Sequence, residues 1–339
     1  MVPVGSPAMV GLSSVPRAFS SRLWQKRPPG AEKTREGLPR GRSRDTGKCS
    51  LARALRPDSA FLRQLAYAGA RFGPRFVIEH SPKLFGTAFA LALSKTRKRV
   101  RSNLRRVKGQ QSFLDEQRDV VQTFTSYAAC LAESLGIERD DADNTELSVL
   151  GEAHLREALA AERGVILVTG HIGPWDSAAR LLAKDFSADV LVVMLAEADE
   201  RARQIHDSVR ERTGVRIVHV GEHPLDAMPL LRHVRGGGVL AIQLDRAAPG
   251  GRSLDVELFG EVEHMPEGPF RLAALSGAPI VPIFAHRVGY FSYEFSIEPP
   301  IWVERGARHA ELQAAAASAA RSMQSFIARH PTEWFHFAN

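Results

Sequence analysis

The chain has 339 residues, 44% of them hydrophobic, which is enough for one large domain or for a domain with an appended segment. Its two cysteines, Cys49 and Cys130, are too few and too far apart for a disulfide framework or a zinc site, so a reducing compartment is expected. The net charge of +7 is unevenly spread, because residues 1–110 hold 24 Lys and Arg against 5 Asp and Glu. Such a basic segment meets nucleic acid, anionic lipid or an acidic carrier protein, or is a solvated tail.

Residues 1–50 are rich in Pro, Gly, Ser and Arg without apolar periodicity, and we predict a disordered basic tail there. An arginine-rich, acid-poor start is also typical of an organelle transit peptide, and a mispredicted start codon gives the same pattern. The first residues lack a compact apolar core, so we expect no secretory signal. The chain has no apolar run of about 18 residues, so we also expect no transmembrane helix.

Residues 51–145 have helical patterns and form a predicted helical N-terminal region. The predicted helices are 57–72, 81–107 and 114–136. The second begins with the apolar run 84–93, which is too short to span a bilayer, and continues into a strongly cationic run. An apolar patch beside Lys and Arg suits contact with an anionic membrane surface. A solvated helix face and the docking of an acidic carrier protein remain open for the same charges.

From about residue 146, short apolar runs alternate with helical patterns. The predicted strands are 164–170, 189–196, 215–220, 238–244, 256–261, 279–286 and 293–299, and the predicted helices are 174–186, 198–213, 224–235, 267–276 and 309–329. Because parallel strands need crossover connections, this alternation predicts an α/β fold with a mostly parallel central sheet flanked by helices. The predicted α/β domain occupies residues 146–339.

The stretch "VILVTGHIGPWD", residues 165–176, places a histidine at the end of a buried strand and an acid at the start of a helix. Ligands of open α/β sheets bind beyond the carboxyl ends of the strands, where His171 is expected. Gly173 and Pro174 suit a tight turn, which lets His171 and Asp176 converge. A histidine held by a carboxylate is a general base in a fixed tautomer. From spacing alone, the two residues are equally well a polar strand end and a helix-start acid.

This block resembles the His-x4-Asp/Glu block of glycerolipid acyltransferases, and more closely that of the bacterial lipid A biosynthesis acyltransferases, which include the phosphatidylinositol mannoside acyltransferases. That family typically reads His-Phe/Leu-Gly-Asn-Trp-Glu here. This chain keeps His171, Gly173 and Trp175, and it has Pro174 for Asn and Asp176 for Glu. Further blocks agree in order and spacing: "RVRSNLRRVKG" at 99–109, "GGGVLAIQLDR" at 236–246, the run 256–287 and "HPTEWFHF" at 330–337.

The resemblance implies a glycerolipid acyltransferase-like fold and roles for the residues of the histidine block. His171 is expected to remove a proton from the acceptor hydroxyl, and Asp176 is expected to orient His171. Gly173 and Trp175 are expected to contact the substrate. Backbone donors near Gly173 are candidates to stabilise the oxyanion.

Two further pairs are candidate substrate-binding residues. Asp245 and Arg246 follow a predicted strand, where the carboxylate would support His171 and the guanidinium would hold a phosphate or the phosphopantetheine of a carrier. A surface Asp-Arg turn is the alternative. Glu267 and Gly268 resemble the Pro-Glu-Gly element that contacts the acceptor phosphate in glycerolipid acyltransferases. They are equally suited to begin a helix, where Glu is favoured.

The activity that the resemblance implies is acyl transfer by a membrane-associated enzyme. It would move a fatty acyl chain from an acyl carrier protein (acyl-ACP) or coenzyme A (acyl-CoA) thioester to a hydroxyl of a lipid A-like glycolipid or a phospholipid. The expected location is the cytoplasmic face of the inner membrane, with peripheral attachment. We expect no metal, no cofactor beyond the thioester co-substrate and no nucleic-acid partner. The alternatives are a lipid hydrolase or thioesterase using the same histidine and acid, and a noncatalytic lipid-binding protein.

Overall fold

The computed structural model describes residues 67–137, 139, 145–176, 189–195, 216–220, 226–247 and 250–337. All of them belong to one compact unit, Gly47–Asn339. The predicted tail at 1–50 and the predicted helix 198–213 lie outside the described residues, as do the greater parts of the predicted helices 57–72 and 174–186.

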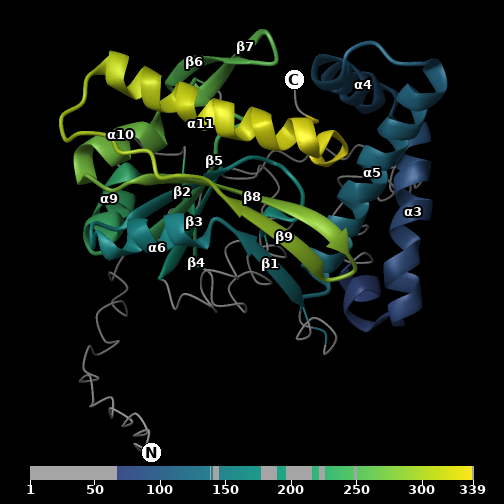
Figure 1. Cartoon of the computed structure of the whole chain (residues 1–339). Coiled ribbons are helices and arrows are strands. Elements are labelled where there is room, and N and C mark those ends of the chain that lie inside the picture. The colour runs from purple at the N-terminus through teal and green to yellow at the C-terminus, as the bar shows by residue number, and fades with distance from the viewer. Residues whose placement is uncertain are drawn as a thin grey trace, which may run out of the picture. The chain divides into compact units, whose positions relative to one another are not determined.

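A seven-stranded sheet lies at the centre of the described structure (Figure 1). Its strands, in the order β1-β9-β8-β2-β5-β3-β4, are β1 (Glu146–Leu150), β9 (Ser292–Ile297), β8 (Ile280–Gly289), β2 (Val165–Thr169), β5 (Val239–Gln243), β3 (Val190–Leu195) and β4 (Arg216–Val220). All pairings between these strands are parallel except that of β8 with β9. The predicted α/β class with a mostly parallel sheet is confirmed.

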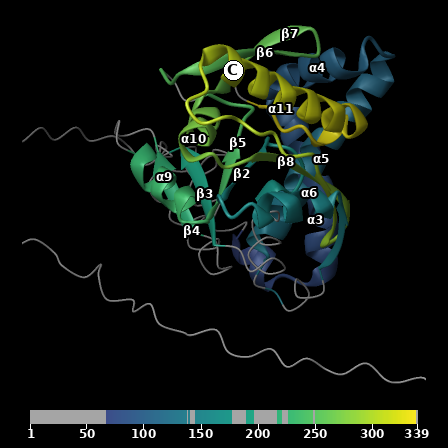
Figure 2. The same ribbon diagram turned by 60° about the vertical axis from the view of Figure 1, so that its left-hand side comes forward.

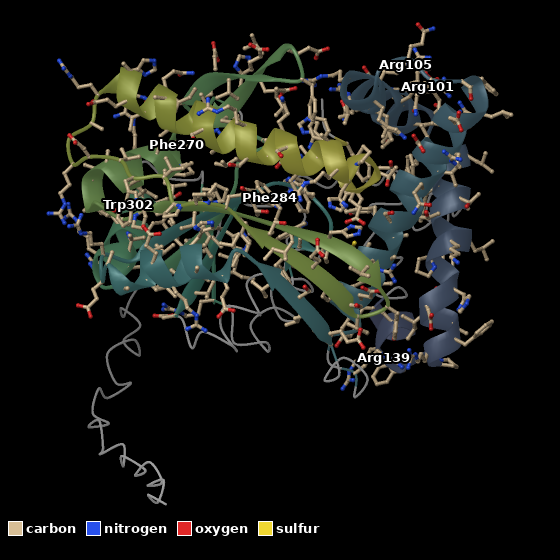
Figure 3. The ribbon with its side chains drawn as sticks, in the orientation of Figure 1. Arg101, Arg105, Arg139, Phe270, Phe284 and Trp302 are labelled. Atoms are coloured by element: carbon tan, nitrogen blue, oxygen red, sulfur yellow. The ribbon has the colours of Figure 1, made fainter. Side chains whose placement is uncertain are left out.

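Both faces of the central strand β2 are covered. On one face, Ile166 and Val168 pack beneath α9 (Ala227–Arg235), α10 (Gly268–Ser276) and α11 (His309–Arg329); on the other, Val165 and Leu167 pack with α6 (Glu152–Ala160). A strand buried on both faces is a continuous apolar run, which is why "VILV" shows no alternation. In Figure 3, Phe270 and Phe284 lie in the layer between the sheet and α11.

The region predicted as a single strand, 256–261, is instead a hairpin, and that boundary was wrong. Strand β6 (Ser253–Leu258) pairs antiparallel with β7 (Glu261–Pro266) in a separate two-stranded sheet. The two turn residues, Phe259 and Gly260, both have positive φ, as a tight two-residue hairpin turn requires. The predicted strand therefore ran across the turn.

Three helices gather at one end of the sheet: α3 (Arg75–Ala92), α4 (Ser94–Lys108) and α5 (Phe113–Leu135) (Figures 1 and 2). The predicted helix 81–107 is divided at Leu93. Arg97 stabilises the break, because its guanidinium donates to the carbonyls of Ala90 and Leu91 at the end of α3, 2.7 and 2.8 Å away. The proposed division at residue 146 separates helices from sheet, and as a domain boundary it stays a prediction.

Ion pairs join α4 to its neighbours. Arg106 reaches the β6–β7 hairpin, where it donates to Glu263 at 2.6 Å and to the carbonyl of Leu258 at 2.8 Å. Arg105 pairs with the buried Glu116 of α5 at 2.6 Å, and it projects from α4 beside Arg101 in Figure 3. Arg97, Arg105 and Arg106 of the cationic run therefore bind other groups of the protein. Among the described helices, none combines the length and the hydropathy that a bilayer crossing needs.

The contact between α3 and α5 depends on a glycine. The buried positions of α3 include Pro82, Gly86 and Ala90, which recur every four residues and form one stripe. A Cβ atom on Gly86 would lie 2.6 Å from the Cα of Thr125 in α5, so the two helices approach too closely for any side chain there.

We expect Gly86→Val to destabilise the protein by about 1–3 kcal/mol, because overpacking forces the two helices apart. Thermal unfolding monitored by circular dichroism measures the change. Ala88→Val is the control, since Ala88 is exposed on the same helix and receives the same side chain. Helix propensity alone would make Ala88→Val the costlier change, because glycine is a poorer helix former than alanine. Equal losses in the two variants would contradict close packing at Gly86.

Candidate active site

The carboxyl ends of β2 and β5 bring two distant residues together. The strands are neighbours in parallel register, with Thr169 opposite Gln243, and Leu244 donates its N–H to the carbonyl of Thr169 at 2.8 Å. His171 and Asp245 each stand two residues beyond their strand. Parallel strands end at the same edge of a sheet, so the two residues become neighbours although 74 positions separate them.

The carboxylate of Asp245 holds both the ring and the backbone of His171. Its Oδ1 lies 2.8 Å from Nδ1 of His171, and its Oδ2 accepts the N–H of His171 at 3.0 Å. An ionised carboxylate only accepts, so Nδ1 carries the proton and Nε2 remains as the basic ring atom. The side chain of Asp245 is 1% exposed and that of His171 is 23% exposed. The arrangement is an anchored base with access to solvent.

Asp245 stays ionised despite its burial. Burial by itself raises the pKa of this carboxyl, but the charge and hydrogen bonds of His171, together with His336 nearby, hold the pKa well below its usual range. A carboxylate that remains charged beside an imidazole stabilises the imidazolium that forms when the base takes a proton.

The carboxylate on Nδ1 is therefore not the one that the sequence suggested. We expected Asp176 to orient His171, but in the structure Asp176 stands in the first helical turn beyond the loop and accepts a hydrogen bond from Ser134 of α5 at 3.0 Å. The Nδ1 position belongs to Asp245, for which support of His171 was the second expectation. A catalytic role of Asp176 stays a prediction.

The loop after β2 is fixed by a segment from the C-terminus. Phe335 donates its N–H to the carbonyl of His171 at 2.7 Å, and Gly173 donates its N–H to the carbonyl of Glu333 at 2.9 Å. Ile172 is fully buried and forms an antiparallel bridge with Trp334. The backbone N–H of Gly173 is thus engaged, which removes it from the expected oxyanion donors.

Gly173 is required by the shape of this loop. Its φ of +53° lies in the left-handed region, and a Cβ atom there would lie 2.1 Å from the carbonyl oxygen of Ala285. Trp175 follows, with its ring edge-on to that of His171 at 6.1 Å between centroids. Gly173 therefore shapes the loop, and Trp175 lies next to the base. Contacts of either residue with a substrate stay predictions.

Arg246 and Glu267 have structural partners. Arg246 lies beside the pair and donates to the carbonyl of Phe335 at 3.0 Å. Glu267 precedes α10, whose first residue is Gly268, and pairs with Arg271 at 2.8 Å; the hydrogen bond from Arg271 lowers the pKa of Glu267. No contact in the described structure joins Glu267 to His171. The substrate-binding roles of these three predicted residues stay predictions.

A group of buried and partly buried titratable residues near β8, which we call the β8 charge cluster, gave no signal in the sequence. Its members are Glu133, His286, Arg287, Tyr293, His330 and Glu333. Glu133 of α5 pairs with Arg287 at 2.7 Å, and Glu333 lies 2.9 Å from Nδ1 of His286. Glu133 is one of several acids in an amphipathic helix, and Glu333 is in the "HPTEW" block, so the spacing of neither residue indicated a site. The cluster is connected to the loop after β2, because the backbone carbonyl of Glu333 also accepts the N–H of Gly173.

A family model described as bacterial lipid A biosynthesis acyltransferase matches residues 50–339. The chain belongs to this family. The sequence-based resemblance to an acyltransferase family is therefore confirmed, and the match includes both His171 and Asp245. Among the described residues, no group of three or more His, Cys, Asp or Glu side chains is arranged to hold a metal ion.

Several curated relatives carry one name. The phosphatidylinositol mannoside acyltransferase of Mycobacterium tuberculosis is 29% identical over 186 residues, which cover 54% of this chain and 56% of the relative. The chain thus spans little more than half the length of that relative. The protein of the same name from Mycolicibacterium smegmatis is 27% identical over 240 residues, covering 69% of this chain and 76% of the relative.

One solved structure is also similar, that of the 1-acyl-sn-glycerophosphate acyltransferase of Thermotoga maritima. It is 11% identical in sequence, with a TM-score of 0.36, and the alignment covers 77% of this chain and 99% of that protein.

The Glu333–His286 pair should contribute pH-dependent stability. The hydrogen bond with Glu333 raises the pKa of His286 above its ordinary value of 6.5, against the opposing effect of burial. A raised histidine pKa stabilises the fold below the unfolded value, and this stabilisation is lost as pH rises through the folded value. We expect Glu333→Gln to lower Tm more at a pH of about 5.5 than at about 8.5. Glu304→Gln, at an exposed position, is the control. A Tm loss independent of pH would contradict the ion pair.

Proposed function

We propose that this protein transfers a fatty acyl group from a thioester donor to a hydroxyl of a glycolipid or phospholipid acceptor. The observation that carries the proposal is the His171–Asp245 pair, a base with a free Nε2 at the carboxyl edge of the sheet. Membership of an acyltransferase family supports the choice of acyl transfer over other reactions that a histidine base performs. The mycobacterial relatives named as phosphatidylinositol mannoside acyltransferases support a glycolipid acceptor.

In this mechanism Nε2 of His171 takes the proton from the acceptor hydroxyl. The oxygen attacks the thioester carbonyl carbon, and a carbon–oxygen bond forms. Collapse of the tetrahedral intermediate breaks the carbon–sulfur bond, and the leaving thiolate takes the proton back from His171. Asp245 stays ionised throughout and stabilises the imidazolium of the intermediate. No covalent intermediate on the protein is needed, and either acyl-ACP or acyl-CoA supplies the thioester.

Asp176 has a supporting part in this proposal. Its hydrogen bond from Ser134 connects the start of the helix after the catalytic loop to α5. Asp176 then acts on the position of the loop, whereas Asp245 acts on the proton of His171. Losing Asp245 should therefore cost more activity than losing Asp176.

The helical end of the molecule is the proposed membrane contact, which would place the protein peripherally on the cytoplasmic face of the inner membrane. Exposed apolar residues gather on α3 opposite its contact with α5, among them Phe76, Leu84 and Leu91, each 71% exposed. Exposed cations begin α4, where Lys95 and Lys98 form no ion pair within the described part of the chain. An apolar helix face beside lysines suits an interface with anionic lipid.

We expect His171→Ala to lower the rate of lipid acylation by about 10²–10⁴-fold, because general base catalysis supplies about that factor. Asp245→Asn should lower it strongly, and Asp176→Asn less. Mass spectrometry of the lipid product after incubation with thioester donor measures the rates. His264→Ala is the control, since His264 forms an exposed pair with Asp255 on the hairpin.

Near-normal acylation by a folded His171→Ala protein would overturn the mechanism. Release of free fatty acid in place of acylated lipid by the unaltered protein would show a hydrolase that activates water with the same pair. Binding of lipid without either product would show a noncatalytic lipid-binding protein.

For the membrane contact, we expect sedimentation with anionic phosphatidylglycerol vesicles that weakens as salt rises, since salt screens the attraction. Lys95→Glu with Lys98→Glu should reduce binding further. Arg232→Glu with Arg321→Glu is the matched control, because it changes charge equally at exposed positions on other helices. Leu84→Ser should reduce binding at every salt concentration. Binding that none of these changes affects would exclude α3 and α4 as the membrane contact.

A further inference from the structure

The segment Glu333–His336 contacts both the loop that carries His171 and the carboxylate of Asp245. The carbonyl of Glu333, the bridge of Trp334 and the N–H of Phe335 hold the loop that carries His171. The next residue, His336, turns its ring toward Asp245, and its Nδ1 lies 3.9 Å from Oδ2. The segment therefore contacts both members of the pair. Its backbone holds the loop that carries His171, and the ring of His336 faces the carboxylate of Asp245.

His336 is held in this place by its own contacts. Asn103 of α4 donates to its carbonyl at 2.9 Å, and its ring lies 5.4 Å from the ring of Trp334. The side chain is 14% exposed. Within the described structure its Nδ1 is buried and has no hydrogen-bond partner. A buried ring nitrogen without a partner, next to a buried carboxylate, has that carboxylate as its natural counterpart when it carries a proton.

We propose that His336 is a positioning residue of this reaction, which shares the Asp245 carboxylate with His171 and so sets how firmly Asp245 holds the proton of His171. The inference rests on the proposed function of His171. One oxygen of Asp245 faces the ring of His171, and the other faces both the His171 N–H and His336. A donor or positive charge at His336 draws negative charge of the carboxylate away from His171, and the imidazolium at His171 is then stabilised less.

The other charged groups next to His336 are two arginines. Arg246 donates to the carbonyl of the residue before it, and Arg106 of α4 lies 5.9 Å from the ring of Trp334. Arginine keeps its charge throughout the working range. The β8 charge cluster at the other end of the segment does contain titrating groups, so every variant is compared with the unaltered protein over the same pH series.

The experiment measures kcat/KM for acyl transfer against pH in His336→Phe and His336→Gln. Activity falls at low pH because His171 must be unprotonated to act. Without His336, Asp245 holds the proton of His171 more firmly, so the acid limb of His336→Phe should move to higher pH. Glutamine keeps a neutral donor, and His336→Gln should move the limb less in the same direction. His264→Phe, at the exposed hairpin pair, should leave the profile unchanged.

A second measurement needs no turnover. The Nδ1 proton of His171, hydrogen-bonded to Asp245, gives a downfield proton resonance that is identified by its loss in His171→Ala. In His336→Phe this resonance should move further downfield, because the carboxylate is a stronger acceptor once it is no longer shared. The shift tests His336 even if the protein proves to catalyse another reaction, so the two failures are distinguishable.

The proposal is overturned if folded His336→Phe and His336→Gln both keep the acid limb and the proton resonance of the unaltered protein. A loss of Tm with an unmoved acid limb also overturns it, because a purely structural residue has that effect. If His336→Phe does not fold, His336→Gln decides by the same two readouts, since its side chain retains a donor.

Discussion

The buried carboxylate of Asp245 is the constraint on which the rest of this site depends. A charge removed from water costs several kcal/mol unless hydrogen bonds and opposite charge replace the lost hydration. Those partners come from segments far apart in the chain: the loop after β2 supplies His171, and the C-terminal segment supplies His336. The contacts of the Asp245 carboxylate thus connect the carboxyl edge of the sheet to the C-terminal segment. The same contacts hold His171 in place.

Helices α4 and α5 also contact the segments that surround the catalytic pair. Ser134 of α5 reaches Asp176, Glu133 of α5 reaches Arg287 of β8, and Asn103 of α4 reaches the backbone of His336. The two helices that pack against α3, which carries the exposed apolar residues, therefore also hold the catalytic edge of the sheet.

The cationic run of α4 shows how a sequence pattern is divided by the fold. In the sequence, the cationic run is continuous and directly follows the apolar run 84–93. In the structure, Arg97 caps α3, Arg105 pairs with Glu116, and Arg106 enters the hairpin. The acids that pair with Arg105 and Arg106 come from elsewhere in the chain, so local charge counting overestimated the free positive surface. Lys95 and Lys98 of the same run remain exposed.

The sequence by itself determined the elements whose signal is local. The apolar run of β2, the helix 309–329 and the tight turn at Gly173 and Pro174 all follow from residue type and spacing. Only the tertiary structure decided which carboxylate holds His171. Asp176 is five residues away and Asp245 is 74, yet β2 and β5 lie side by side and their ends coincide. Strand order depends on how buried faces pack across the whole sheet, and no local spacing carries that information.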